Sequence, residues 1–230
     1  MVNLKQRSTV PEIMDDFTLP HSEVVPVLIG LENMNTLFGG HQTIIEALQK
    51  LPVQNGWHIS DWGCGGGDAL RAIAKWAATK QLDIKLTGVD ATPSAVEYAR
   101  NAAKAFNNIS FISADVMSGQ LEQFDVVYSS LFTHHFADAE WIALVKKMLA
   151  CSKKAVIITD LHRHWLLYYA IKILTWFTKN TMARNDGPLS VQRAFTKAEL
   201  VRLLAQCSIQ AYSINWIWPF RWQVIIPKPA

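Results

Sequence analysis

Residues 57–68, Trp-His-Ile-Ser-Asp-Trp-Gly-Cys-Gly-Gly-Gly-Asp, decide the fold of this chain. A short apolar strand closes at Asp61 and enters a turn in which Gly63, Gly65 and Gly67 alternate with other residues. Glycine allows backbone angles that a side chain would strain, and it leaves space for a ligand against the main-chain amides at a helix N-terminus. We therefore expect the turn to hold a nucleoside-containing cofactor.

Short apolar strands alternate with amphipathic helices on the C-terminal side of this turn. Strands are expected at 84–89, 109–113, 124–129 and 155–159, with helices at 68–79, 94–106 and 138–150. Buried strands that alternate with helices are typical of a parallel sheet covered on both faces. With two further strands at 208–217 and 222–226, the pattern predicts a Rossmann-like, doubly wound α/β fold with a mostly parallel seven-stranded sheet.

Two helical segments fall outside this alternation. Helices expected at 21–38 and 41–51 precede the first strand, so residues 1–54 are interpreted as an N-terminal helical cap and residues 55–230 as the cofactor-binding domain. A helical insertion at about 161–195 follows the fifth strand. Within it and just after it, we expect a helix at 165–179, a loop at 184–190 and a helix from Thr196 to about 206 that opens with a capping box.

Composition restricts the class of protein. Half of the 230 residues are hydrophobic and 18% are charged, as in a folded globular protein. The net charge of +3 comes without runs of like charge, which argues against a nucleic-acid partner. The three cysteines form no CxxC pair, so we expect no disulfide, no metal site and a cytoplasmic protein. We expect the protein to be a monomer or a homodimer. The apolar segment 165–177 is shorter than the roughly 20 residues of a membrane span.

An acidic residue follows each of the first three strands. Asp61, Asp90 and Asp115 would lie together because the carboxyl ends of parallel strands line one crevice. Each acid alone is compatible with a helix cap or a solvated turn. All three behind one glycine turn favour a site in which Asp90 accepts hydrogen bonds from ribose hydroxyls and Asp115 meets an adenine amino group.

Four motifs of the chain resemble those of a known family. Asp61-Trp-Gly-Cys-Gly-Gly-Gly, Gly88-Val-Asp-Ala-Thr-Pro, Ser113-Ala-Asp-Val and Phe124-Asp-Val-Val-Tyr-Ser-Ser are similar to the successive motifs of class I S-adenosylmethionine-dependent methyltransferases that act on small molecules. The resemblance covers about residues 55–160. It implies S-adenosyl-L-methionine as the cofactor and S-adenosyl-L-homocysteine as its product.

The resemblance also implies which residues contact the cofactor. The methionine end would lie on the glycine turn, the ribose at the end of the second strand, the adenine at the end of the third and the sulfonium at the end of the fourth. The methionine end would contact Asp61, Gly63, Cys64 and Gly65, and the ribose would contact Asp90 and Ala91. The adenine would contact Ala114, Asp115 and Val116, and the sulfonium would lie near Ser129, Ser130 and Leu131.

The loop after the fourth strand bears on the methyl acceptor. Residues 129–136 lack the Asn/Asp-Pro-Pro-Tyr pattern of enzymes that methylate a planar nitrogen, so a hydroxyl (phenol- or quinol-like) or a carbon acceptor is favoured. His134 or His135 is a candidate general base, because imidazole titrates near neutral pH. The alternative is that one histidine only supports the loop and the other lines the site without proton transfer.

The helix expected at 165–179 is apolar nearly all round, which suggests a partly apolar acceptor. Trp165, Tyr168 and Tyr169 are candidates for its pocket wall, with core or dimer contacts as the alternative, and Arg193 is a candidate partner for an acidic group. A nicotinamide-dependent oxidoreductase and a non-catalytic cofactor-binding protein remain open as other functions. The spacing GxGxG, where dinucleotide enzymes use GxGxxG, favours the methyltransferase.

Overall fold

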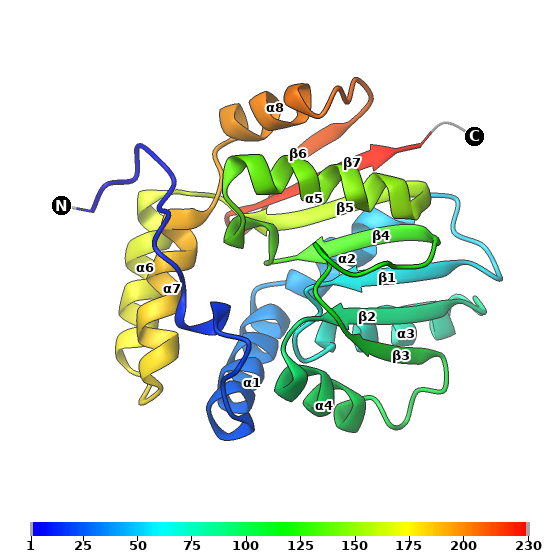
Figure 1. Ribbon diagram of the computed structural model, residues 1–230. Coiled ribbons are helices and arrows are strands. Elements are labelled where there is room, and N and C mark those ends of the chain that lie inside the picture. Colours follow the sequence, from blue (N-terminus) through cyan, green and yellow to red (C-terminus); the bar gives the residue numbers. More distant parts are fainter. Residues whose placement is uncertain (1, 229–230) are drawn as a thin grey trace.

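A computed structural model, which describes residues 2–228, has one seven-stranded sheet with strand order β3-β2-β1-β4-β5-β7-β6 (Figure 1). β1 to β5 are parallel, and β7 runs antiparallel to both β5 and β6. The strands are β1 (His58–Trp62), β2 (Lys85–Asp90), β3 (Ile109–Ser113), β4 (Phe124–Ser130), β5 (Ser152–Leu161), β6 (Ser213–Ile217) and β7 (Arg221–Pro227). This confirms the predicted doubly wound α/β fold.

Helices cover both faces of the sheet. One face packs against α2 (Gly40–Gln49), α3 (Asp68–Thr79) and α4 (Pro93–Ala102), through side chains such as Ile44 and Leu70 that are fully buried. The other face packs against α5 (Asp138–Cys151) and α8 (Lys197–Gln206), through Trp141 and Leu203. The two apolar layers explain why the central strands read as continuous hydrophobic runs.

Most predicted boundaries agree with the structure to within a few residues. The helix at 68–79 and the strand at 109–113 have the predicted bounds. The helix expected at 94–106 ends at Ala102, and the strand expected from 208 begins only at Ser213. The capping box at Thr196 is present, because its hydroxyl accepts the amide of Glu199 and the Glu199 carboxylate accepts the amide of Thr196.

The prediction of a loop at 184–190 is wrong. These residues lie within α7 (Thr181–Arg193), whose N-terminus is capped by the Asn180 side chain. Gly187 allows the helix to approach α6 (Trp165–Trp176), since a Cβ there would lie 3.0 Å from a methyl of Thr175. Asp186 is buried and accepts the amides of residues 13 and 14. These contacts stabilise a helix that the Gly-Pro pair disfavours locally.

Several segments lie beyond the carboxyl ends of the parallel strands. Figure 1 shows the N-terminal segment, α1 (His21–Leu37), α6 and α7 on the side toward which the arrowheads of β1, β2 and β4 point. The short 3₁₀ turn Ile13–Asp15 belongs to this group, and the amide of Ser8 bonds the carbonyl of Gln192 on α7. Within residues 2–228 we find no helix with both the length and the apolarity needed to cross a bilayer.

Candidate active site

The glycine turn between β1 and α3 is closely covered by neighbouring side chains. Gly63 has φ +72°, and a Cβ on it would overlap ring atoms of Phe132. The amides of Gly63 and Cys64 bond the carbonyl of Val89 on β2, which fixes the start of the turn. Only glycine at position 63 satisfies both the backbone angle and the close approach of Phe132.

Asp61 lies at the floor of this turn. It is 2% exposed, and its Oδ1 atom has no hydrogen-bond partner among the described residues. Burial raises the pKa of the Asp61 carboxyl well above its ordinary value. The adjacent Tyr128 hydroxyl opposes this rise, and the nearby charges of Asp68 and Asp90 add to it. A buried carboxylate with a free acceptor atom is costly unless a ligand supplies a donor or a positive charge.

Asp90 ends β2 and faces the glycine turn. One carboxylate oxygen accepts the amide of Gly65 at 2.8 Å, and the other accepts the amide of Thr92 at 2.9 Å. Burial raises the pKa of Asp90, whereas these two hydrogen bonds oppose the rise. Asp90 thus lies against the glycine turn at the carboxyl edge of the sheet.

The residues assigned to the adenine differ in their surroundings. Asp115 is exposed, and its carboxylate accepts the amide of Met117 and the hydroxyl of Ser118. It therefore stabilises the turn after β3, as the alternative interpretation of this acid expected. Val116 is 3% exposed within the core, while Ala91 and Ala114 are half-buried at the ends of the two strands.

The residues assigned to the sulfonium region form the end of β4. Ser129 is fully buried and donates to the carbonyl of Trp62, and Ser130 accepts from the Thr159 hydroxyl. Leu131 has φ +52°, an unusual conformation for a side chain with a Cβ, and such conformations cluster at functional sites. Cys64 is buried, and burial raises the pKa of its thiol well above the ordinary value, which disfavours the reactive thiolate.

His134 supports the loop after β4. It is 3% exposed, and its Nδ1 atom lies 2.7 Å from an oxygen of Asp160 at the end of β5. Asp160 also accepts the amide of His134 and the hydroxyl of Thr133. Burial opposes ionisation of Asp160, but His134 and these hydrogen bonds outweigh it and lower the pKa of the carboxyl. His134 is thus held through both its ring and its backbone.

His135 is the more accessible histidine. Its Nδ1 atom bonds Asp15. Burial would raise the pKa of the Asp15 carboxyl, but the hydrogen bonds and charges of His135 and Arg193 outweigh burial and lower it. The imidazole lines a cavity of about 520 Å³ together with Arg7, Asp15 and Arg193. An ionised Asp15 keeps the proton on Nδ1, so the lone pair of Nε2 is available to a ligand.

Glu12 is the third titratable group of this cluster. It is 7% exposed, its Oε1 atom lies 3.6 Å from Nε2 of His134, and neither atom has a hydrogen-bond partner among the described residues. Burial raises the pKa of Glu12 to about 7. Glu12, His134 and His135 offer three ligand atoms within 4.8 Å of one another, but the Arg193 guanidinium, 3.8 Å from the same Glu12 oxygen, already supplies positive charge there.

Replacing Glu12 by glutamine is expected to flatten the pH dependence of stability. The folded-state pKa of Glu12 is raised from 4.5 to about 7, so its contribution to stability is complete below pH 4.5 and is lost as the pH rises to about 7. Above pH 7 Glu12→Gln should be more stable than the wild type by up to about 3 kcal/mol. Thermal unfolding at pH 5 and pH 8.5 tests this, with the exposed Glu122→Gln as control. Parallel curves for wild type and Glu12→Gln would contradict it.

Two arginines hold the loop that carries the histidines. Arg193 donates to Asp15 and to the carbonyls of His134, His135 and Val10. Arg7 donates to Asp138 and to three backbone carbonyls, those of residues 134, 136 and 193. Because their donors are engaged within the protein, neither guanidinium is free to hold an acidic acceptor, and the predicted role of Arg193 becomes one of positioning.

The aromatic residues suggested for an acceptor wall lie on α6, outside the lining of this cavity. Tyr168 is buried in a small cluster with Leu167 and Val191, whereas Trp165 and Tyr169 are 59% and 43% exposed. The structure therefore does not bring these three residues to His135.

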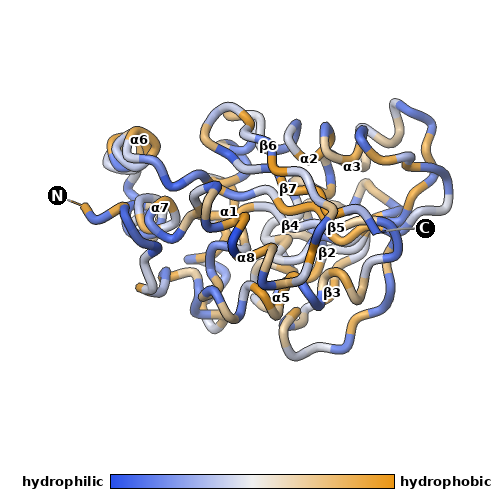
Figure 2. The backbone as a smooth tube through the Cα atoms, turned by 90° about the horizontal axis from the view of Figure 1, so that it is seen from above, coloured by the Kyte–Doolittle hydropathy of each residue, from blue (hydrophilic) through white to orange (hydrophobic). Residues whose placement is uncertain are grey.

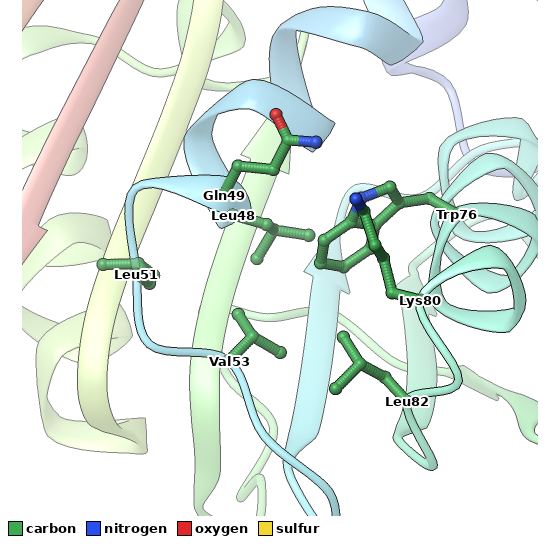
Figure 3. Close-up of a pocket in the computed structure, with 7 residues that line it drawn as sticks. All are labelled: Leu48, Gln49, Leu51, Val53, Trp76, Lys80 and Leu82. Atoms are coloured by element: carbon green, nitrogen blue, oxygen red, sulfur yellow. The ribbon is translucent and has the colours of Figure 1, made fainter.

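A second cavity, of about 220 Å³, lies at the amino ends of the strands (Figure 3). Its lining is mainly apolar and comes from the end of α2, the following loop and the end of α3, with Leu48, Val53 and Trp76 prominent. In doubly wound sheets ligands bind at the carboxyl ends of the strands. The cavity in Figure 3 is therefore on the wrong side of the sheet for a reaction beside the glycine turn and the histidine loop.

The contribution of the N-terminal segment was not predicted from the sequence. Arg7, Glu12 and Asp15 lie more than 100 positions from the histidine loop in sequence and meet it only in the fold. Residues 13–15 form the observed 3₁₀ turn, which brings Asp15 to His135. The bond between Asp160 and His134 was likewise not predicted.

Comparison with known proteins supports the motif assignment. A family model described as "Methyltransferase domain" matches residues 59–155. Trans-aconitate 2-methyltransferases of Shigella flexneri serotype 5b and Escherichia coli O139:H28 are each 27% identical over 100 residues, which are 43% of this chain and 34% of those enzymes. The match thus spans about a third of the length of these curated relatives.

Solved structures with the same fold cover nearly the whole chain. An S-adenosylmethionine-dependent methyltransferase of Aquifex aeolicus is 14% identical with a TM-score of 0.65, and the alignment covers 91% of this chain and 99% of that one. Human N-acetylserotonin methyltransferase, in complex with S-adenosylmethionine, is 12% identical with a TM-score of 0.68, over 97% of this chain and 64% of that one.

The segment that matches the family model contains the features on which the site depends. It begins within β1 and includes the glycine turn, Asp90, Asp115 and the histidine loop, and it ends within β5. Its strand order and parallel register are those of a doubly wound sheet with a crevice at the carboxyl edge. Residues 59–155 are thus similar to the methyltransferase-domain family, and the chain has the fold of S-adenosylmethionine-dependent methyltransferases of known structure.

Proposed function

We propose that this chain transfers a methyl group from S-adenosyl-L-methionine to a hydroxyl or carbon of a small, partly apolar molecule. The observation that carries the proposal is the buried Oδ1 atom of Asp61, which has no hydrogen-bond partner among the described residues. It lies below a glycine turn whose Gly65 amide bonds Asp90 and whose Gly63 packs on Phe132, 6.2 Å from the His135 ring. Asp61 would accept the ammonium of the methionine end, which supplies the missing donor and charge. This fits S-adenosylmethionine better than an anionic pyrophosphate, which three nearby carboxylates would repel.

Asp90 is the residue we assign to the ribose. Each of its carboxylate oxygens accepts one backbone amide and retains the capacity to accept a second donor, such as a ribose hydroxyl. Bound S-adenosylmethionine would supply an electrophilic methyl group on a sulfonium. The protein then contributes alignment and exclusion of water, because an in-line displacement depends mainly on these.

Binding of the cofactor is the first test. Calorimetric titration with S-adenosylhomocysteine should give a dissociation constant in the micromolar range, and Asp90→Ala should weaken it by about 100-fold or more, through loss of two charge-assisted hydrogen bonds. Asp115→Ala is expected to have a smaller effect, because Asp115 is exposed and bonds only its own turn. Folded wild-type protein that binds neither S-adenosylmethionine nor its product would refute the proposed function.

His135 is the residue we assign to the acceptor. Asp15 orients its ring, and the free Nε2 atom is available to take the proton of an acceptor hydroxyl as the methyl group is transferred. His134, which is buried and bonded to Asp160, would position the loop. Arg7 and Arg193 are already bonded within the protein, so we expect the acceptor to have no carboxylate near His135. Such an acceptor would differ from trans-aconitate, the acid named for the curated relatives.

Removing the base should affect turnover and leave cofactor affinity intact. His135→Gln and Asp15→Asn are each expected to lower kcat by about 10²-fold or more, while the dissociation constant for S-adenosylhomocysteine stays unchanged. The assay follows transfer from labelled S-adenosylmethionine to a panel of phenols, quinols and lipid-linked hydroxyls, with the exposed His21→Gln as control. Unchanged kcat in both variants would show that acceptor activation needs no base from this pair.

A further inference from the structure

The outer face of α6 exposes an unusual number of large apolar side chains. Leu167 and Tyr168 point into the protein and are 8% exposed. On the opposite side, spacings of three and four residues place a continuous stripe in solvent within an arc of about 120–180°. Its members are Trp165 (59% exposed), Leu166 (46%), Tyr169 (43%), Ile173 (63%), Trp176 (65%) and Phe177 (81%).

The stripe continues beyond the helix through neighbouring rings. The His164 ring lies 5.7 Å from that of Trp165 and 5.0 Å from that of Phe220, and Phe220 lies 5.9 Å from Trp218. Trp218, in the turn between β6 and β7, is 71% exposed. Two elements far apart in sequence thus contribute to one apolar surface, which we call the α6 surface. Figure 2 shows α6, largely hydrophobic in colour, at the margin of the molecule away from the sheet.

The segment that carries α6 contains basic residues and no acidic ones. No Asp or Glu occurs between Asp160 and Asp186. Lys172, Lys179 and Arg184 are exposed in this segment, and the guanidinium of Arg184 lies 5.3 Å from the ring centre of Trp176. The helix α6 is too short to span a bilayer. Its exposed tryptophan and phenylalanine side chains and the flanking basic residues are typical of helices that lie in the interface of a membrane.

We propose that the α6 surface docks on a bilayer that contains anionic lipids, with α6 parallel to the membrane plane. Exposed apolar side chains of this size are costly in water and would enter the acyl boundary, while the three basic residues would remain among the lipid headgroups. A second copy of this chain would bring Lys172, Lys179 and Arg184 into an interface to which residues 161–185 contribute no acidic partner. This inference is independent of the proposed methyl transfer.

Vesicle sedimentation tests the docking. The full chain is mixed with vesicles of phosphatidylcholine alone or with 30 mol% phosphatidylglycerol (about one lipid in three anionic), at low and at high salt. We expect binding to the anionic vesicles that weakens with salt. Trp176→Ala/Phe177→Ala should reduce the partition coefficient by about tenfold, and Lys172→Glu/Lys179→Glu should remove the preference for anionic vesicles.

Controls separate docking from general stickiness. Ile112→Ala/Val201→Ala removes two exposed apolar side chains from other faces and should bind vesicles as the wild type does. Circular dichroism and thermal unfolding establish that each variant is folded. The proposal is overturned if wild-type protein does not sediment with anionic vesicles, or if Trp176→Ala/Phe177→Ala binds them equally. Sedimentation velocity that shows a dimer dissolved by the same substitutions would also overturn it, in favour of self-association.

Discussion

Gly63→Ala is expected to abolish measurable binding of S-adenosylhomocysteine and to lower the stability of the folded chain. An alanine at φ +72° is strained by about 1–2 kcal/mol on its own. Its Cβ would also overlap the Phe132 ring, so the ring or the turn must move. The ring centre of Phe132 lies 5.1 Å from that of Phe136 and 6.2 Å from that of His135. Displacement of Phe132 would therefore spread from the glycine turn to the histidine loop.

Two variants separate the clash from the strain. Gly39 has a similar φ of +69° but no atom within 4 Å of the position that a Cβ would occupy, so Gly39→Ala should cost only the strain and leave binding unchanged. In a Phe132→Ala background the clash is absent, and the further cost of Gly63→Ala should fall toward that of Gly39→Ala. Calorimetry and thermal unfolding provide both readouts. Wild-type affinity in Gly63→Ala would show that the turn does not contact the cofactor.

Arg193→Met is expected to destabilise the protein by about 3–5 kcal/mol, since it leaves a buried charge network without its cation. Arg193 is 6% exposed and pairs with Asp15 while it donates to the carbonyls of His134 and His135. Its loss would release the N-terminal segment and the histidine loop together. We expect turnover to fall with the folded population and the remaining folded enzyme to bind S-adenosylhomocysteine normally.

Arg202→Met is the matched control for this experiment. The Arg202 side chain is 49% exposed and pairs with Asp138 at the surface, so its loss should cost no more than about 1 kcal/mol. Chemical denaturation compares the two variants directly. An Arg193→Met protein with wild-type stability and only a raised KM would instead identify Arg193 as a direct contact of the acceptor.

The sheet and the cofactor edge could be predicted because their determinants are local. The turn at Gly63, the acid at Asp90 and the apolar strands between the helices can each be recognised within a few residues. The helix α7 could not be predicted in the same way. Its Gly187-Pro188 pair disfavours a helix locally, and only the packing of Gly187 on α6 and the buried bonds of Asp186 explain why the helix forms there.

The acceptor side was less accessible to sequence reasoning. His134 and His135 were recognisable because they follow a strand end, but nothing local distinguishes the buried one from the one that faces the cavity. The difference comes from Asp160 and Asp15, which are 26 and 120 positions away. Candidate bases can thus be found from a motif, whereas their division of roles requires the tertiary structure.

The placement of Glu12 and Asp15 has a consequence for how the enzyme is assembled during synthesis. A ribosome makes these residues well before it makes their partners, since Asp15 and Arg193 are 178 positions apart. The segment that carries them must therefore wait, unanchored, until α7 has been synthesised. The strands β1 to β5 are synthesised before α7, so the sheet edge that carries Asp61 and Asp90 can form before Arg193 fixes the histidine loop.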